Sequence, residues 1–239
     1  SPWPIGVHFS LTKLKTFISF GLNYQANTLI SIINSSVLPV FVGMVSGPRA
    51  VGFVSWAGGI RQTGLAPLEV SQRLIFPAVA RTQDTPHLLK MLIEKLLEFS
   101  CMVSFPLLTA IIALAPWFTV IVYTSQWLPG LTALYLSVIS GVFMIYNVVL
   151  MDSLLALGKA RTVRNITGIW ALLQWVLTIP LVLLWNYNGV VLAGLLVSMT
   201  FFIPLMHIRK IVDIDIWSGT LPYLGYSMIS GAVMFFLSH

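Results

Sequence analysis

Of the 239 residues, 57% are hydrophobic and 8% are charged, whereas an average soluble domain has about 45–50% apolar and about 25% charged residues; this excludes an ordinary soluble protein. The net charge of +6 does not indicate nucleic-acid binding, because the lysines and arginines are spread over several loops rather than gathered on one face. The single cysteine, Cys101, excludes an internal disulfide, and no spacing of Cys or His resembles a zinc site.

The chain contains apolar segments of about the length, roughly 20 residues, that a helix needs to cross a bilayer. They lack the period-two alternation of a membrane barrel, so we expect an all-α fold, a polytopic transmembrane helical bundle of about seven spans. The predicted spans are 17–45, 51–80, 88–122, 131–157, 166–185, 190–208 and 221–237. The first turns of the third span are amphipathic and predict a segment at the membrane interface, with Lys90, Glu94 and Glu98 on its wet face.

Positive charges gather at one end of these spans. Ten lysines and arginines fall on the side of the N-terminus, and Arg49 alone falls in the loops of the opposite side. By the positive-inside rule, the N-terminal side is cytoplasmic. We therefore expect a cytoplasmic N-terminal segment at 1–16, a six-helix transmembrane bundle at 17–208, a cytoplasmic loop at 209–220 and an additional transmembrane helix at 221–239. Because neither a Met nor a signal-peptide pattern precedes the first span, we also expect a fragment of a longer protein.

The first span, FISFGLNYQANTLISIINSSVLPVFVG, carries amides on one face. At 100° per residue, Asn23, Asn27 and Asn34 lie within about 40° of one another, with Ser31 beside them. Amides inside a span either hydrogen-bond to neighbouring helices or line a hydrated cavity. The first span therefore has a polar face that needs a partner.

The second span holds charges in the stretch WAGGIRQTGLAPLEVSQRL. On a continuous helix, Gln62, Glu69 and Arg73 form one stripe about 40° wide, although Pro67 can disturb this register by removing a backbone hydrogen bond. Glu69 and Arg73 are spaced i, i+4 with the acid first, the better order for an ion pair. Arg61 lies at the edge of the stripe without an acidic partner within one turn. Because an unpaired charge is costly in a bilayer, we expect Arg61 to face water, an acid of another helix or an anionic ligand.

Later spans contribute weaker polar stripes. Asp152, near the end of the fourth span, is an isolated acid that the basic loop GKARTVRN could neutralise. Gln174 shares a face of the fifth span with Thr167 and Thr178, and Ser140 shares a face of the fourth span with Asn147. For the Thr and Ser residues of these stripes, hydrogen bonds between packed helices are the simpler interpretation, whereas the first and second spans together favour a hydrated cavity.

Motifs of enzymes do not occur in the sequence: it has no nucleophile elbow, no P-loop and no HExxH. We therefore predict neither an enzyme nor a cofactor. Other patterns do stand out. The chain contains, in order, FG followed by amides, the turn VGMVSGPRAVG and a long span that ends in FPAVARTQ. These are followed by LLEFSCMVSFPLLTAIIALAPWFTVIVYTSQWLPG and by LLALGKARTVRN. Together they resemble one half of the oligosaccharide flippases, the polysaccharide transporters of the multidrug/oligosaccharidyl-lipid/polysaccharide exporter superfamily.

The resemblance implies the C-terminal half of a transporter in which two six-helix bundles face a central cavity. Such a protein would flip polyprenyl-pyrophosphate-linked oligosaccharide repeat units across the bacterial inner membrane by alternating access, for O-antigen or exopolysaccharide synthesis. The implied partners are the lipid-linked oligosaccharide, membrane lipids, and the polymerase and sugar transferases of the same pathway; nucleic acid is not among them.

The resemblance also implies roles for the polar residues of the spans. Pyrophosphate or acidic sugars would meet Arg61 and Arg73, because a guanidinium donates paired hydrogen bonds to such oxygens. Glu69 and Asp152 would be candidates for ion coupling. Amides can bond sugar hydroxyls as donors and acceptors, and the candidates are Asn23, Asn27, Asn34, Gln62 and Gln174.

Two alternatives stay open. A drug or metabolite antiporter of the same superfamily would have fewer cations and more aromatic and acidic residues in its cavity. A membrane-embedded polysaccharide polymerase or transferase would need a large loop or a cluster of acids and histidines, and the sequence shows neither.

Overall fold

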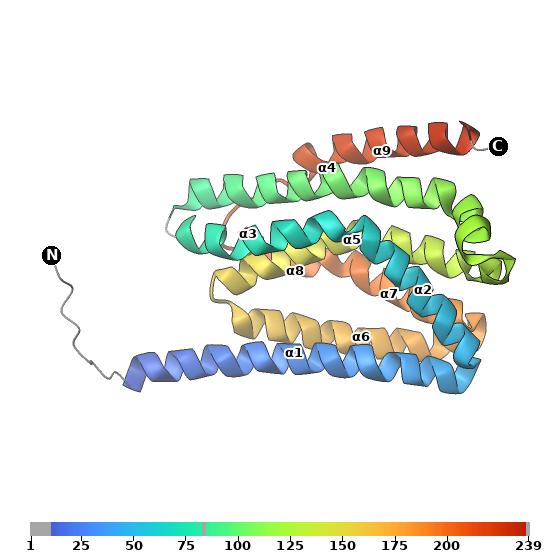
Figure 1. Cartoon of the computed structure of the whole chain (residues 1–239). Helices are drawn as coiled ribbons and strands as arrows, with labels where there is room; N and C mark the ends of the chain where they lie inside the picture. The colour runs from blue at the N-terminus through green and yellow to red at the C-terminus, as the bar shows by residue number, and fades with distance from the viewer. Residues whose placement is uncertain (1–10, 83–84, 238–239) are drawn as a thin grey trace, which may run out of the picture.

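The computed structural model describes residues 11–82 and 85–237, and within these ranges the chain folds into helices that run side by side (Figure 1). A π-helical turn, η1 (Thr119–Tyr123), and a 3-10 helix, η2 (Ser125–Gly130), connect the fourth and fifth α-helices, and a 3-10 turn, η3 (Met199–Phe201), connects the seventh and eighth. The α-helices are α1 (Leu11–Ser46), α2 (Pro48–Gly64), α3 (Ala66–Thr82), α4 (Pro86–Phe118), α5 (Leu131–Ala156), α6 (Ala160–Trp185), α7 (Tyr187–Ser198), α8 (Phe202–Arg209) and α9 (Trp217–Leu237).

The predicted spans coincide with these helices, which confirms an all-α transmembrane bundle. The helical segments that are long and apolar enough to cross a bilayer are Ile18–Ser46, Pro86–Tyr123, Ser125–Ala156, Ala160–Trp185 and Tyr187–Arg209. The second predicted span is covered jointly by α2 and α3, and the seventh is α9. Of the predicted N-terminal segment 1–16, residues 1–10 lie outside the described residues and 11–16 belong to α1.

The second span is broken between Gly64 and Ala66. Pro67 has no N–H to offer the carbonyl oxygen of Thr63. The chain turns here, and the N–H of Leu65 is shared between the carbonyl oxygens of Arg61 and Gln62, at 3.2 and 3.1 Å. Figure 1 shows α2 crossing the bundle obliquely, whereas α3 runs along it. The polar stripe of Gln62, Glu69 and Arg73, expected on one continuous helix, is therefore divided between α2 and α3.

The last helix, α9, packs along α4 and is held there by polar contacts. The hydroxyl of Tyr223 donates to a carboxylate oxygen of Glu98 at 3.1 Å, and the N–H of Asp215 donates to Glu94 at 2.7 Å. Glu94 and Glu98 thus meet α9 and the loop before it, while their side chains remain 27% and 29% exposed, so their place on a wet face at the membrane interface stays a prediction. The local sequence pattern does not predict these hydrogen-bond partners of Glu94 and Glu98, because they lie in a distant part of the chain.

The helices differ in how deeply they are buried. In the most apolar window of the segment that contains α5, 56% of the residues are buried, against 6% for the window in α1. Val138, Ile145 and Leu150 of α5 are almost wholly inaccessible to solvent. The core is therefore built around α5, and α1 covers one side of the bundle, where it contacts α6 and the start of α2.

Candidate functional site

The bundle contains a polar cleft made of two adjacent hollows. The Arg61 hollow, of about 290 Å³, lies among α1, α2, α5, α6 and α7. The Asp152 hollow, of about 350 Å³, lies among α1, α3, α5, α6 and α7. Met144, Gly194 and Ser198 line both hollows, which makes them parts of one cleft.

Arg61 projects from α2 into its hollow and is held by α5. Its Nη1 donates to the hydroxyl of Ser140 at 3.4 Å, while its buried Nε has no hydrogen-bond partner in the described part of the chain. A side chain at Gly141 would come within 3.3 Å of the Cγ of Arg61, so this glycine lets the stem of the arginine lie against α5. Among the described residues, no carboxylate lies within 4.0 Å of the guanidinium. We expected Arg61 to face water, an acid of another helix or an anionic ligand. Because no acid of the described helices is close enough, water and an anionic ligand remain.

Two amides complete the Arg61 hollow. The side-chain oxygen of Asn34, on α1, is buried and unpaired. Gln174, on α6, is 8% exposed, and its amide nitrogen donates to the hydroxyl of Thr178 at 3.1 Å and to the carbonyl oxygen of Val190 at 3.4 Å. The hollow therefore offers a charged donor and an amide acceptor that neighbouring side chains do not satisfy.

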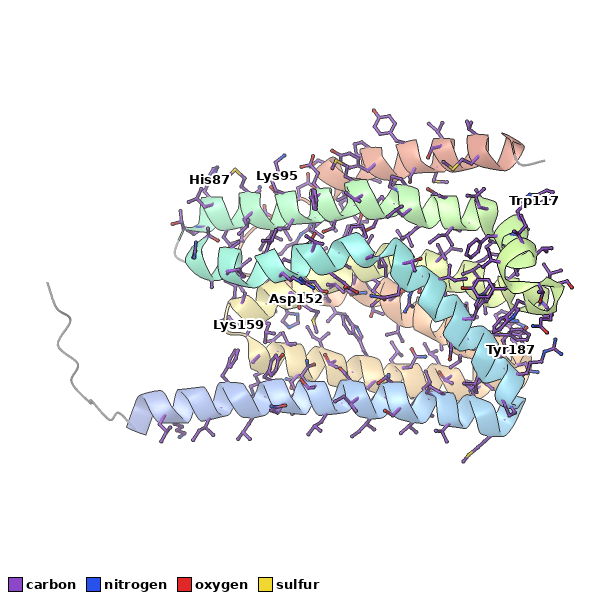
Figure 2. All side chains as sticks on the ribbon, viewed as in Figure 1. His87, Lys95, Trp117, Asp152, Lys159 and Tyr187 are labelled. Carbon is purple, nitrogen blue, oxygen red and sulfur yellow. The ribbon has the colours of Figure 1, made fainter. Side chains whose placement is uncertain are left out.

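The Asp152 hollow has a different balance of polar groups. The Asp152 carboxylate accepts a hydrogen bond of 3.0 Å from the amide of Gln72, on α3. The side-chain oxygens of Asn27 and Asn147 and the indole N–H of Trp170 are buried there without partners. A carboxylate and two free amide oxygens make this hollow richer in acceptors than the Arg61 hollow. Figure 2 shows Asp152 nearer to the Lys159 end of the bundle than to the Tyr187 end.

The partner expected for Asp152 is wrong. The sequence suggested the cations of the loop GKARTVRN, but the ion pairs among the described side chains are Lys90–Glu94 and Lys95–Glu98. The loop lies at the end of α5, where Gly158 turns the chain away with a φ of 74°. Gln72, from a helix far away in sequence, takes the place of the expected cation.

Four of the predicted site residues lie outside the two hollows: Asn23, Gln62, Glu69 and Arg73. Asn23 bonds to Arg164 of α6. The Glu69 carboxylate accepts a hydrogen bond of 3.1 Å from the amide of Gln62, across the break in the second span. Among the described side chains, no ion pair joins Glu69 to Arg73. The expected i, i+4 pair is therefore wrong, because Glu69 lies in the first turn of α3 and reaches back to α2 instead.

Three residues of the cleft were not among the candidates from sequence: Gln72, Asn147 and Trp170. One signal is present in the sequence, because Asn147 shares a face of the fourth span with Ser140, for which packing between helices is the simpler interpretation. Asn147 does hold helices together, because its amide nitrogen donates a hydrogen bond of 2.8 Å to the carbonyl oxygen of Ser198, at the end of α7 and the start of η3. Its oxygen stays unpaired in the Asp152 hollow.

Comparison with known proteins places these features in a family context. A family model described as "Polysaccharide biosynthesis protein" matches residues 1–132. The chain is 25% identical over 123 residues to the lipopolysaccharide biosynthesis protein WzxC of Escherichia coli strain K12. This alignment covers 51% of this chain and 25% of WzxC. The chain is 23% identical over 159 residues to the teichuronic acid biosynthesis protein TuaB of Bacillus subtilis strain 168, covering 66% of this chain and 33% of TuaB.

A solved structure shares the fold. The chain superposes on the lipid II flippase MurJ, in its inward closed conformation, with a TM-score of 0.74 and 16% sequence identity. The match covers 98% of this chain and 51% of MurJ. The chain thus spans about half the length of MurJ, and its alignments cover a third or less of the two curated relatives. With its span-length apolar helices, the chain is a multi-pass inner-membrane protein.

Proposed function

Because this chain belongs to the family of polysaccharide biosynthesis proteins, we propose that it is one helical bundle of a flippase that carries a lipid-linked oligosaccharide across the inner membrane. In this proposal residues 17–208 form the six-helix bundle, 1–16 and 209–220 lie in the cytoplasm, and 221–239 form an additional transmembrane helix. Coverage of about half of MurJ is consistent with a second, facing bundle. The two would alternate in opening a central cavity to either side of the membrane.

The observation that carries the proposal is the state of Arg61. A guanidinium with a buried, unpaired Nε needs acceptor oxygens, and a phosphate or an acidic sugar supplies them in a planar, paired arrangement. The oxygen of Asn34 in the same hollow, unpaired among the described residues, can accept a hydrogen bond from a hydroxyl group of a ligand. A sugar attached to pyrophosphate is one ligand that offers both acceptor oxygens for Arg61 and a hydroxyl group for Asn34. Asn27 and Gln174 would add contacts to sugar hydroxyls, while Asn23, Gln62 and Arg73 would act only from outside the hollows.

The Asp152 hollow is the better candidate for ion coupling. Asp152 lies in the cleft beside unpaired amide oxygens, whereas Glu69 is exposed and outside both hollows. An acid inside a bundle that binds and releases a proton or a metal cation can link the movement of helices to an ion gradient. If it does so here, Asp152→Asn removes the dependence of transport on the gradient, and transport that still follows the gradient in this variant argues against the role.

The experiment that tests the function replaces Arg61 in the full-length protein that contains this chain. Arg61→Ala should abolish surface polysaccharide while the amount of protein in the membrane stays unchanged, and Arg61→Lys should retain part of it. Arg49→Ala is the matched control, because Arg49 is exposed, lies outside the cleft and contacts the Phe53 ring and the carbonyl oxygen of Gln126. Normal polysaccharide from Arg61→Ala would remove this residue from the mechanism.

A further inference from the structure

A third hollow lies apart from the polar cleft. It is an apolar groove of about 850 Å³ among α2, α4, η1 and α5, and the described residues that line it carry no charge. Figure 2 shows Trp117, which lines the groove, at the same end of the bundle as Tyr187. Leu107 and Leu114 line it from α4 and are both more than 40% exposed, so the groove opens on an outward-facing side of that helix.

Helix α2 separates the groove from the cleft. Two adjacent glycines show this: Gly58 lines the Arg61 hollow and Gly59 lines the groove. Successive residues of a helix point about 100° apart, so the two hollows lie on different faces of α2. A Cβ at Gly59 would meet nothing within 4 Å, which means that the missing side chain leaves room in the groove.

One polar atom of a residue that lines the groove lacks a partner among the residues that the structure describes. Trp56 lines the groove and is 8% exposed, and its indole N–H is buried without a hydrogen bond. The ring is held in place by neighbours, edge-on to Tyr123 at 5.7 Å and tilted against Trp127 at 5.4 Å between centroids. A buried N–H without a partner is unfavourable, so an acceptor atom within an otherwise apolar ligand would be stabilised here.

We propose that the groove binds a membrane glycerophospholipid, with an acyl chain along α4 and an ester carbonyl oxygen accepting the Trp56 N–H. An acyl ester places a neutral acceptor next to a hydrocarbon chain, which matches one donor in an uncharged groove. An isoprenoid chain carries no oxygen until its pyrophosphate, and the groove has no cation to balance that charge. The lipid is therefore a constituent of the bilayer, distinct from the cargo proposed for the Arg61 hollow.

Photolabelling of the full-length protein in vesicles tests this. The probe is phosphatidylethanolamine with a diazirine on one acyl chain, and labelled peptides are located by mass spectrometry. We expect label on the peptides that contain Trp56 and residues 107–118. Gly59→Leu fills the groove and should remove most of that label. Trp56→Phe, which keeps the ring but not the N–H, should reduce it by roughly two- to tenfold, the effect of one hydrogen bond.

Gly225→Leu on α9 is the matched control, because a Cβ there also meets nothing within 4 Å and Gly225 lies outside the groove. It should keep the label. Equal labelling of wild type and Gly59→Leu would overturn the proposal, and so would loss of label when an unlabelled isoprenoid pyrophosphate competes. Arg61→Ala, which should stop polysaccharide export, should still be labelled, so failure of the lipid site and failure of the proposed function are distinguishable.

Discussion

The side-chain oxygen of Asn23 on α1 accepts a hydrogen bond of 2.6 Å from Nη1 of Arg164 on α6. The remaining donors of this guanidinium reach the side chain of the adjacent Asn165, at 2.8 and 3.3 Å. A cation near the start of α6 is thus bonded to two neutral amides. This contact ties the exposed helix α1 to its neighbour near the Lys159 end of the bundle.

Removing this bond should loosen α1. Asn23→Ala is expected to lower the free energy of unfolding in detergent by about 1 kcal/mol, the scale of one polar contact between membrane helices. Asn23→Asp, which makes an ion pair with Arg164, should recover the loss. Gln25→Ala changes an exposed amide of the same helix and serves as the control. If Asn23→Ala and Gln25→Ala shift thermal unfolding equally, the contact contributes nothing specific.

The hairpin between α6 and α7 predicts a strict requirement for glycine at position 189. A Cβ at Gly189 would collide with the carbonyl group of Leu181 and lie 2.6 Å from the backbone nitrogen of Val182. Because backbone atoms cannot give way as a flexible side chain does, Gly189→Ala should destabilise the protein by about 1–3 kcal/mol or more. Denaturation in detergent measures the effect.

The control for the hairpin is Gly168→Ala on α6. A Cβ at Gly168 meets nothing within 4 Å, and alanine favours a helix over glycine by up to about 1 kcal/mol. Gly168→Ala should therefore be neutral or stabilising. A Gly189→Ala protein as stable as Gly168→Ala would show that the two helices do not approach as closely as described.

The orientation in the membrane can be tested with two single cysteines. In a Cys101→Ser background, Ser125→Cys and Thr162→Cys place thiols at opposite ends of the bundle, in η2 and at the start of α6. The native thiol of Cys101 is buried. In intact cells, a membrane-impermeant maleimide should label Ser125→Cys and leave Thr162→Cys unlabelled until the membrane is opened. Labelling of both from outside would contradict the arrangement of spans.

Acid should weaken the start of α9. Asp215 accepts hydrogen bonds from the backbone N–H groups of Trp217 at 3.0 Å and Ser218 at 3.4 Å. These bonds, that of Trp217 foremost, hold the pKa of the Asp215 carboxyl below its ordinary value of 3.8. The contribution to stability is therefore fully present above pH 3.8 and is lost as the pH falls through the lowered pKa.

The measurement is thermal unfolding of wild type and Asp215→Asn across that pH range. The wild type should be the more stable at neutral pH, and the two midpoints should converge in acid. Asp213→Asn, an exposed change in the same loop, is the control and should match the wild type at neutral pH. A difference between wild type and Asp215→Asn that persists at low pH would refute the capping role.

The sequence predicted the five long apolar helices well because each depends only on a local property, an apolar run of sufficient length. It failed at the partners of Glu69 and Asp152, since both depend on where the helices sit in space. Pro67 signalled a disturbed register, but neither the position of the break at Leu65 nor the reach of Glu69 to Gln62 follows from a helical wheel. Gln72 approaches Asp152 only because α3 packs against α5.

The prediction for Arg61 depended on local chemistry alone. An arginine without a local acid in an apolar stretch must find its environment elsewhere in the fold, and the structure places it in a polar hollow beside Ser140. Asn34 and Gln174 join it there from helices that the sequence could not position relative to α2. Local chemistry thus identified which residue needed an explanation, while helix packing determined its neighbours.

The shallow burial of α1 has a dynamic consequence. This helix supplies Asn27 and Asn34 to the wall of the cleft, yet only 6% of its most apolar window is buried. Segments with few buried contacts undergo local opening at a lower free energy than the core does. Its backbone amides should therefore exchange hydrogen for deuterium before those of α5. Movement of this one wall, with the remaining helices intact, would open the polar cleft that Asn27 and Asn34 line.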